Sequence, residues 1–180
     1  MNDFMKATGI VRRIDDLGRI VIPKEIRKNL RIKEGDNLEV FVQNEEVILK
    51  KYSMMNKIND LAQELTDAIY TFMKHSIFIT DTDSVVAASG PLKKRFLNKN
   101  ISEFITESIK RRDKMIQNHF KELEFVTDEK IECSYVMSTI LVNGEATGMI
   151  LIISEDEKLG EIEMQMASIV SSFMTKYLEQ

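Results

Sequence analysis

The sequence predicts an α+β chain of two domains: an N-terminal β-barrel built by exchanging hairpins between two copies, and a C-terminal antiparallel sheet with helices. Residues 5–52 alternate short β-branched runs with turn residues, which is typical of small strands. Two later segments carry apolar residues three and four apart, which is typical of amphipathic helices, and the sequence between them is rich in β-formers. The predicted boundaries are residues 1–52, a linker over 53–56, and residues 57–180.

Four short strands and one helix are predicted for the N-terminal domain. Gly18 ends a turn that joins the first two strands, because glycine tolerates positive φ. Pro23 is poor inside a ladder but suited to open a helix, which then has Ile26 and Leu30 on one face. The expected strands cover Gly9–Asp15, Arg19–Ile22, Leu38–Val42 and Val47–Leu49, and the expected helix covers Lys24–Leu30.

This N-terminal unit is too small to fold alone. It has about fifty residues, no cysteine for a disulfide, no cluster of metal ligands and few aromatic side chains. We therefore expect an obligate dimer in which hairpins exchanged between two chains merge two half-cores into one.

Positive charge is concentrated in the N-terminal domain. Residues 1–52 carry 11 Lys and Arg against 9 Asp and Glu, whereas the whole chain has a net charge of -4. Between Lys6 and Lys33 the bias rises to 9 basic residues against 3 acidic ones. Such a local excess is the pattern expected for contacts to DNA phosphates, with a merely solvated surface as the alternative.

The run from Met5 to Tyr52, which includes GIVRRIDDLGRIVIPKEIR, closely resembles the AbrB-type swapped-hairpin DNA-binding domain of bacterial transition-state regulators. The resemblance implies that double-stranded DNA is bound by Arg12, Arg19, Arg27 and Lys28, with Arg13 as a weaker addition. The family more often has arginine at the position of Lys28. Lysine keeps the positive charge there but lacks the planar guanidinium group that can bind two acceptors at once. No recognition helix is visible, and we therefore expect readout through the DNA backbone and DNA shape.

The C-terminal domain is predicted to begin and end with an amphipathic helix. The first covers Lys57–Lys74, and the last covers Gly160–Leu178. A third helix is expected to open at Asn100, with Glu103 completing a capping box. Strands are expected over Ser76–Thr80, Val85–Ser89, Glu132–Val142 and Ala146–Ser154, in a sheet with its helices on one face.

The apolar stripes on the two terminal helices allow two interpretations. They could pair with another chain in a four-helix bundle and so build a homotetramer, or each could cover the sheet of its own domain. The stripes consist of Ile58, Leu61, Leu65, Ala68 and Phe72 on the first helix and Ile162, Met166, Ile169, Val170, Phe173 and Tyr177 on the last.

The order of helices and strands in residues 57–180 resembles a GAF domain, the small-molecule sensing fold related to PAS. The resemblance implies a site for a small-molecule effector between the sheet and the helices, but no residue pattern in the sequence identifies a ligand. Asp81, Ser89 and Ser134 stand at strand ends where a pocket wall could lie, yet turns commonly use these residue types. An AbrB-type domain followed by a GAF-like domain resembles a family of sporulation regulators, which implies a forespore transcription factor that activates and represses late genes.

Enzymatic and metal sites find no support in the sequence. Cys133 is the single cysteine, and His75 and His119 have no acidic partner at metal-ligand spacing. No phosphate-binding glycine loop, nucleophile elbow or HExxH motif is present. We expect no enzyme activity, no cofactor and no metal. The lack of a signal core and of a long apolar run favours a cytoplasmic protein that does not contact the membrane.

Two classes of function remain in competition. The first is a DNA-binding transcription regulator whose C-terminal domain assembles chains and could sense a small-molecule effector. The second is an antitoxin, because the same swapped-hairpin domain occurs in antitoxins. Antitoxin tails are usually short and polar, whereas Lys57–Gln180 has enough patterned apolar residues to fold, which favours the regulator.

Overall fold

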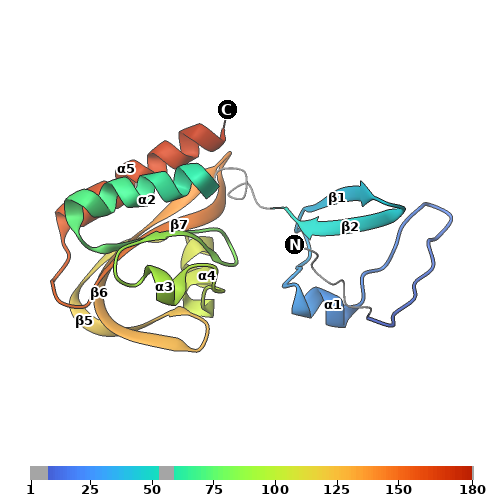
Figure 1. Ribbon diagram of the computed structural model, residues 1–180, viewed down its shortest axis with the longest axis horizontal. Helices are drawn as coiled ribbons and strands as arrows, with labels where there is room; N and C mark the ends of the chain where they lie inside the picture. The colour runs from blue at the N-terminus through green and yellow to red at the C-terminus, as the bar shows by residue number, and fades with distance from the viewer. Residues whose placement is uncertain (1–7, 53–58, 180) are drawn as a thin grey trace. The chain divides into compact units, whose positions relative to one another are not determined.

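The computed structural model describes residues 8–52 and 59–179, and the chain divides into two compact units, residues 1–52 and 53–180 (Figure 1). We call them the N-terminal and C-terminal domains. The first contains α1 (Lys24–Asn29), β1 (Leu38–Gln43) and β2 (Glu46–Lys51). The second contains α2 (Asn59–Met73), β3 (Ser76–Thr80), β4 (Val85–Ser89), α3 (Lys93–Phe96), α4 (Glu103–Lys110), β5 (Lys114–Val126), β6 (Glu129–Val142), β7 (Glu145–Ser154) and α5 (Glu161–Leu178).

In the N-terminal domain, β1 and β2 form an antiparallel hairpin whose register runs from Leu38 opposite Lys51 to Gln43 opposite Glu46. Its two loop residues, Asn44 and Glu45, both have positive φ, at 47° and 67°. Two such residues match the twist of the flanking strands. The helix α1 begins directly after Pro23, whose fixed φ suits that position.

The segments 9–15 and 19–22, which we call the arms, differ from the prediction. They are joined by the expected turn, but neither arm is a strand in this chain. Their apolar side chains are largely exposed, with Val11 at 86%, Ile14 at 68% and Val21 at 73%. Strand pairing needs a neighbouring backbone, and within the described chain the arms bond to each other only close to their turn.

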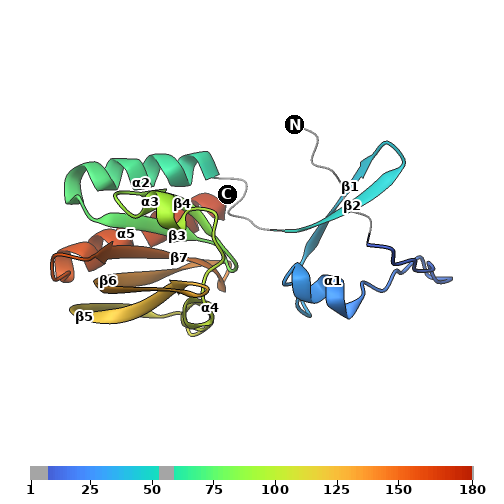
Figure 2. The same cartoon turned by 60° about the horizontal axis from the view of Figure 1, so that its bottom comes forward.

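The C-terminal domain is built on a five-stranded antiparallel sheet in the order β4-β3-β7-β6-β5 (Figure 2). Helices lie on both faces, with α2 and α5 on one and α3 and α4 on the other (Figure 1). The expectation that helices cover only one face is therefore wrong. Strand alternation explains the two layers, because Ile77 and Ile79 enter the core beneath α2 and α5 while Phe78 enters the opposite core.

Sequence patterning misplaced one helix start and missed two elements. The helix α4 is capped by Ser102, whose Oγ accepts a hydrogen bond from Ile105 N at 3.3 Å, so Asn100 is not the cap. The strand β5 was not predicted because a bulge between Gln117 and Lys121 interrupts its alternation. The short helix α3 was also missed.

The terminal helices each present two different apolar faces. On α2 the buried residues are Ala62, Thr66 and Ile69, and on α5 they include Met164, Ala167, Val170 and Met174. Of the predicted stripes, Leu61, Leu65 and Met166 are half-buried against the same core, whereas other members lie on the exposed side of each helix. We call the most exposed of them the open stripe: Phe72 at 83%, Ile162 at 72%, Ile169 at 63%, Phe173 at 44% and Tyr177 at 46%.

The sheet requires glycine at position 148. A Cβ atom there would lie 2.1 Å from the carbonyl oxygen of Thr80 on the neighbouring strand, which is backbone and cannot rotate away. We expect Gly148→Ala to lower the free energy of unfolding by about 3 kcal/mol, measured by urea denaturation, since β3 and β7 must separate locally. Gly160→Ala is the matched control because a Cβ there meets nothing within 4 Å. Equal stability of the two variants would contradict the expectation.

Candidate nucleic-acid interface

The candidate interface is built on the turn that joins the two arms. Gly18 adopts φ 76° and donates its N–H to the carbonyl oxygen of Asp15 at 3.0 Å. The backbone N–H of Asp15 in turn donates to the carbonyl oxygen of Arg19 at 3.1 Å. Positive φ strains other residues, so the glycine allows the chain to reverse and brings Arg19 opposite Asp15.

The carboxylate of Asp15 holds this turn. Its Oδ1 accepts hydrogen bonds from the N–H groups of Leu17 at 3.0 Å and of Arg19 at 2.8 Å. Its Oδ2 accepts from Nε of the Arg19 guanidinium at 2.7 Å. These bonds from the backbone and side chain of Arg19 stabilise the ionised form and lower the pKa of Asp15 below its ordinary value. Asp15 is absent from the predicted site residues, although an acidic residue four positions before an arginine is a usable signal in the sequence.

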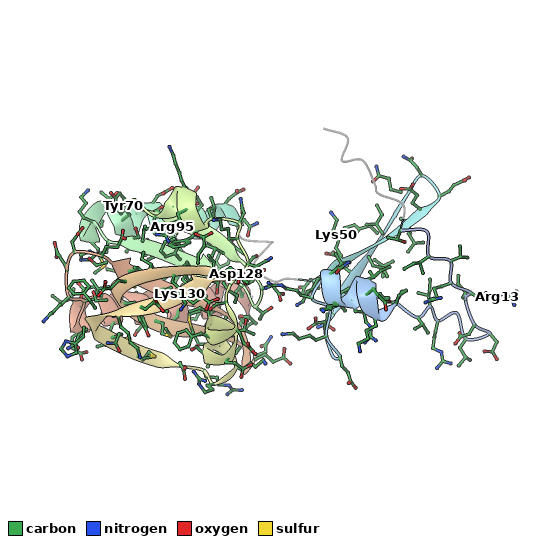
Figure 3. All side chains as sticks on the ribbon, turned by 90° about the horizontal axis from the view of Figure 1, so that it is seen from below. Arg13, Lys50, Tyr70, Arg95, Asp128 and Lys130 are labelled. Atoms are coloured by element: carbon green, nitrogen blue, oxygen red, sulfur yellow. The ribbon has the colours of Figure 1, made fainter. Side chains whose placement is uncertain are left out.

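All five predicted DNA-binding side chains are exposed. Arg12, Arg13 and Arg19 come from the arms, and Figure 3 shows Arg13 extending away from the rest of its domain. Arg27 and Lys28 occupy the last turn of α1. The candidate cations therefore come from two segments, and cations near a helix C-terminus are also favoured by the helix dipole.

An apolar groove lies behind the arms of the N-terminal domain. Its volume is about 310 Å³, and Arg12 is the charged residue on its wall. The remaining walls come from both arms, α1 and β2, namely Ile10, Ile20, Val21, Ile22, Pro23, Ile26, Leu30, Ile32, Val47 and Leu49. A groove of this composition can accept apolar side chains of another polypeptide.

The C-terminal residues considered for an effector site have structural roles. Asp81 Oδ1 accepts from the backbone N–H groups of Asp83 at 2.8 Å and Ser84 at 2.7 Å, which closes a turn. Ser89 Oγ bonds to Asp67 on α2 and lowers the pKa of that carboxyl group. Ser134 Oγ accepts from Leu159 N at 3.2 Å and so fixes the loop before α5.

Cys133 is fully buried, and burial raises the pKa of its thiol to about 12, with the Glu155 carboxylate acting in the same direction. Because the thiolate is the reactive form, we expect almost no modification of native protein by a disulfide reagent at pH 8, and rapid modification after unfolding in urea. Absorbance of the released thiolate measures this directly. Equal rates before and after unfolding would contradict this expectation.

Within the described part of the chain, no group of His, Cys, Asp and Glu side chains is arranged to hold a metal ion. Among the same residues, no helix has the length and apolar character needed to cross a membrane.

Two protein families match the sequence. The family described as "Stage V sporulation protein T C-terminal, transcription factor" matches residues 57–179. The family described as "Antidote-toxin recognition MazE, bacterial antitoxin" matches residues 11–57.

Two individual proteins of Bacillus subtilis (strain 168) are similar to this chain. Stage V sporulation protein T of Bacillus subtilis (strain 168) is 46% identical over 179 residues, which cover 98% of this chain and 100% of the relative. The transition state regulatory protein AbrB of the same organism is 61% identical over 49 residues, which cover 27% of this chain and 51% of the relative.

A solved structure of low sequence identity supports the fold of the larger domain. The PixJ GAF domain of Thermosynechococcus elongatus, in its blue-light absorbing form, aligns with a TM-score of 0.55 at 12% identity and covers 72% of this chain and 89% of that chain. This likeness concerns the fold alone. The predicted combination of an AbrB-like domain and a GAF-like domain is confirmed, and the chain belongs to the stage V sporulation protein T family of transcription factors.

Proposed function

We propose that this protein is a sporulation transcription regulator that activates and represses late forespore genes, and that it binds double-stranded DNA through its N-terminal domain. The DNA contacts are assigned to Arg12, Arg13, Arg19, Arg27 and Lys28. The observation that carries the proposal is the exposure of all five of these cations on the arms and α1 of a chain whose net charge is -4. Membership in a family of transcription factors supports it.

The DNA-binding form is proposed to be a dimer made by exchanging the arms. Exposed Val11, Ile14 and Val21 leave the N-terminal domain with apolar surface that water does not favour. The apolar groove behind the arms offers a place for such side chains from a second copy. Two-fold symmetry then places both sets of cations on one assembly, which suits a duplex.

A second association is proposed for the C-terminal domain, giving a homotetramer. The open stripe lies on α2 and α5, away from the side chains that these helices bury against their own sheet. Phe173 and Tyr177 stack there with ring centroids 6.1 Å apart, so they present one continuous aromatic surface. Apolar surface of this kind on two neighbouring helices fits a four-helix bundle with another copy.

The proposed site for a small-molecule effector lies between the sheet and the helices α3 and α4. Phe78, Phe96 and Phe125 fill this layer and have no exposed surface. An effector would have to displace at least one of these rings.

The test is fluorescence anisotropy of full-length protein with a duplex from an upstream region of its own genome, over a salt series. We expect the logarithm of affinity to fall with the logarithm of salt at a slope of roughly -5, for about six neutralised phosphates. The double variant Arg19→Ala/Arg27→Ala is expected to bind at least about 100-fold more weakly, since each arginine contact contributes roughly 1–3 kcal/mol.

The matched control is Lys94→Ala/Lys110→Ala, which removes two exposed cations from the C-terminal domain. It is expected to bind almost as tightly as the wild type. If the wild type binds no better than the arginine variant, the basic arms are a solvated surface and the proposal fails.

An antitoxin is the alternative function, and the match of residues 11–57 to the MazE family favours it. The C-terminal domain argues against it, because residues 59–179 bury two apolar cores among their own side chains. Salt-dependent DNA binding that requires Arg19 and Arg27 does not by itself exclude an antitoxin. A C-terminal domain that is stably folded in the isolated protein would exclude an antitoxin, because antitoxin tails fold only when they bind their toxin.

A further inference from the structure

We infer that Asp15 is a positioning residue for DNA recognition, because its carboxylate holds the Arg19 guanidinium in one orientation at the tip of the arms. This inference rests on the proposed DNA-binding function. It adds an acidic residue to a site assigned only to cations, and it concerns how strongly the protein prefers one duplex over another.

The two oxygens of the carboxylate have separate tasks. Oδ1 accepts two backbone N–H groups, from Leu17 at 3.0 Å and Arg19 at 2.8 Å, and so fixes the path of the turn. Oδ2 accepts Nε–H of Arg19 at 2.7 Å and so fixes the direction of a side chain that is 70% exposed. An exposed arginine without such a bond samples many rotamers.

The bond to Nε leaves the useful part of the guanidinium available. Arginine has five N–H donors in a rigid plane, and Asp15 takes the one nearest the main chain. Among the described residues, none accepts a hydrogen bond from the two Nη groups of Arg19. These groups form the fork that binds two acceptors of a phosphate or a guanine edge together.

Charge and orientation act in opposite directions at Asp15. A carboxylate close to DNA repels every duplex to a similar extent, whatever its sequence. An oriented fork instead favours a duplex that presents acceptors in the matching place, because less side-chain freedom is lost on binding. Removing the carboxylate should therefore leave binding to arbitrary DNA unchanged or tighter while reducing the preference for the best duplex.

Asp15→Asn separates the two tasks of the carboxylate. An asparagine Oδ1 can still accept both backbone N–H groups, but its side-chain NH2 group is a donor and cannot accept Nε–H. The turn is thus retained and the hold on Arg19 is lost. Thermal unfolding of the full-length variant checks that the domain remains folded.

The experiment measures two affinities for each full-length variant. One duplex is selected by the wild type from a random-sequence pool, and the other is a scrambled duplex of equal length and composition. We expect Asp15→Asn to lower the ratio of the two affinities by about 3- to 10-fold, the effect of losing one ordered side chain. In an Arg19→Ala background, Asp15→Asn should change the ratio no further.

Two results would overturn this inference alone. A uniform rise in affinity for both duplexes, with the ratio unchanged, would make Asp15 a repulsive charge only. Loss of the ratio that persists in the Arg19→Ala background would make it a turn-forming residue only. If the wild type binds neither duplex, the proposed function itself fails, and this inference with it.

A further variant keeps the inference testable if Asp15→Asn does not fold. Arg19→Lys retains Asp15, the turn and the positive charge, but lysine has no planar fork. It should lose the same preference between the two duplexes as Asp15→Asn loses. An undiminished preference in Arg19→Lys would contradict the inference.

Discussion

Replacing Ile169 and Phe173 by glutamate is expected to convert tetramers into dimers. Both side chains belong to the open stripe, with exposures of 63% and 44% in the single chain, so the substitutions leave the domain's own core intact. In a four-helix bundle formed by two copies of the C-terminal domain, the two glutamates would place negative charge in an apolar interface. Each lost apolar side chain contributes roughly 1.5–3 kcal/mol, which implies at least a 100-fold weaker association of dimers, or about 2.7 kcal/mol.

Sedimentation velocity over a wide concentration range measures this shift. Ser172→Glu is the control for added charge, because it places a glutamate at an exposed position of α5 outside the open stripe. The control should sediment like the wild type. A wild type that remains dimeric at every concentration would show that the stripe serves no association between copies.

Phe78→Ala is expected to lower the free energy of unfolding of the C-terminal domain by about 3–5 kcal/mol, the usual cost of removing a fully buried phenyl ring. Phe78 has no exposed surface, and its ring centroid lies 4.9 Å from that of Phe125 and 5.8 Å from that of Phe96. Edge-to-face contacts among the three rings add to the area that they bury.

Urea denaturation followed by circular dichroism gives the stability of the variant. The control is Phe120→Ala on β5, where the side chain is 39% exposed and the loss should be small. A loss for Phe78→Ala no larger than for the control would mean that this layer is loosely packed. An effector could then enter between the sheet and α3 and α4 at little cost.

Local patterns predicted the elements whose partners lie close in the chain. The bounds of β3 and β4 agree with the prediction because both strands are short, buried and bordered by turn residues. The edge strand β5 escaped prediction because its bulge breaks the alternation that marks a strand. The start of α4 was misplaced because Asn100 and Ser102 are both acceptable caps, and only tertiary contacts select Ser102.

Helical periodicity identified real apolar stripes but could not say what they contact. On α2 the spacing marked Leu65, which is only half-buried, and Phe72, which is exposed, whereas the buried residues are Ala62, Thr66 and Ile69. A buried threonine and alanine carry a weak hydropathy signal, so the stronger stripe hid the packing face. For the candidate DNA-binding residues, the residue types and their exposure were predictable. The spacing of Asp15 and Arg19 allowed an ion pair to be predicted, but which guanidinium nitrogen the carboxylate contacts depends on the geometry of the turn.

The exposed arms have a consequence for synthesis of the protein. Residues 1–52 leave the ribosome before residues 53–180, yet Val11, Ile14 and Val21 stay largely exposed in the described part of the chain. The C-terminal domain, which is made later, completes its cores from its own residues. A nascent chain therefore exposes apolar segments while the C-terminal domain is still being translated. Neighbouring ribosomes on one messenger RNA would supply a second copy at the stage when these segments are most prone to aggregate.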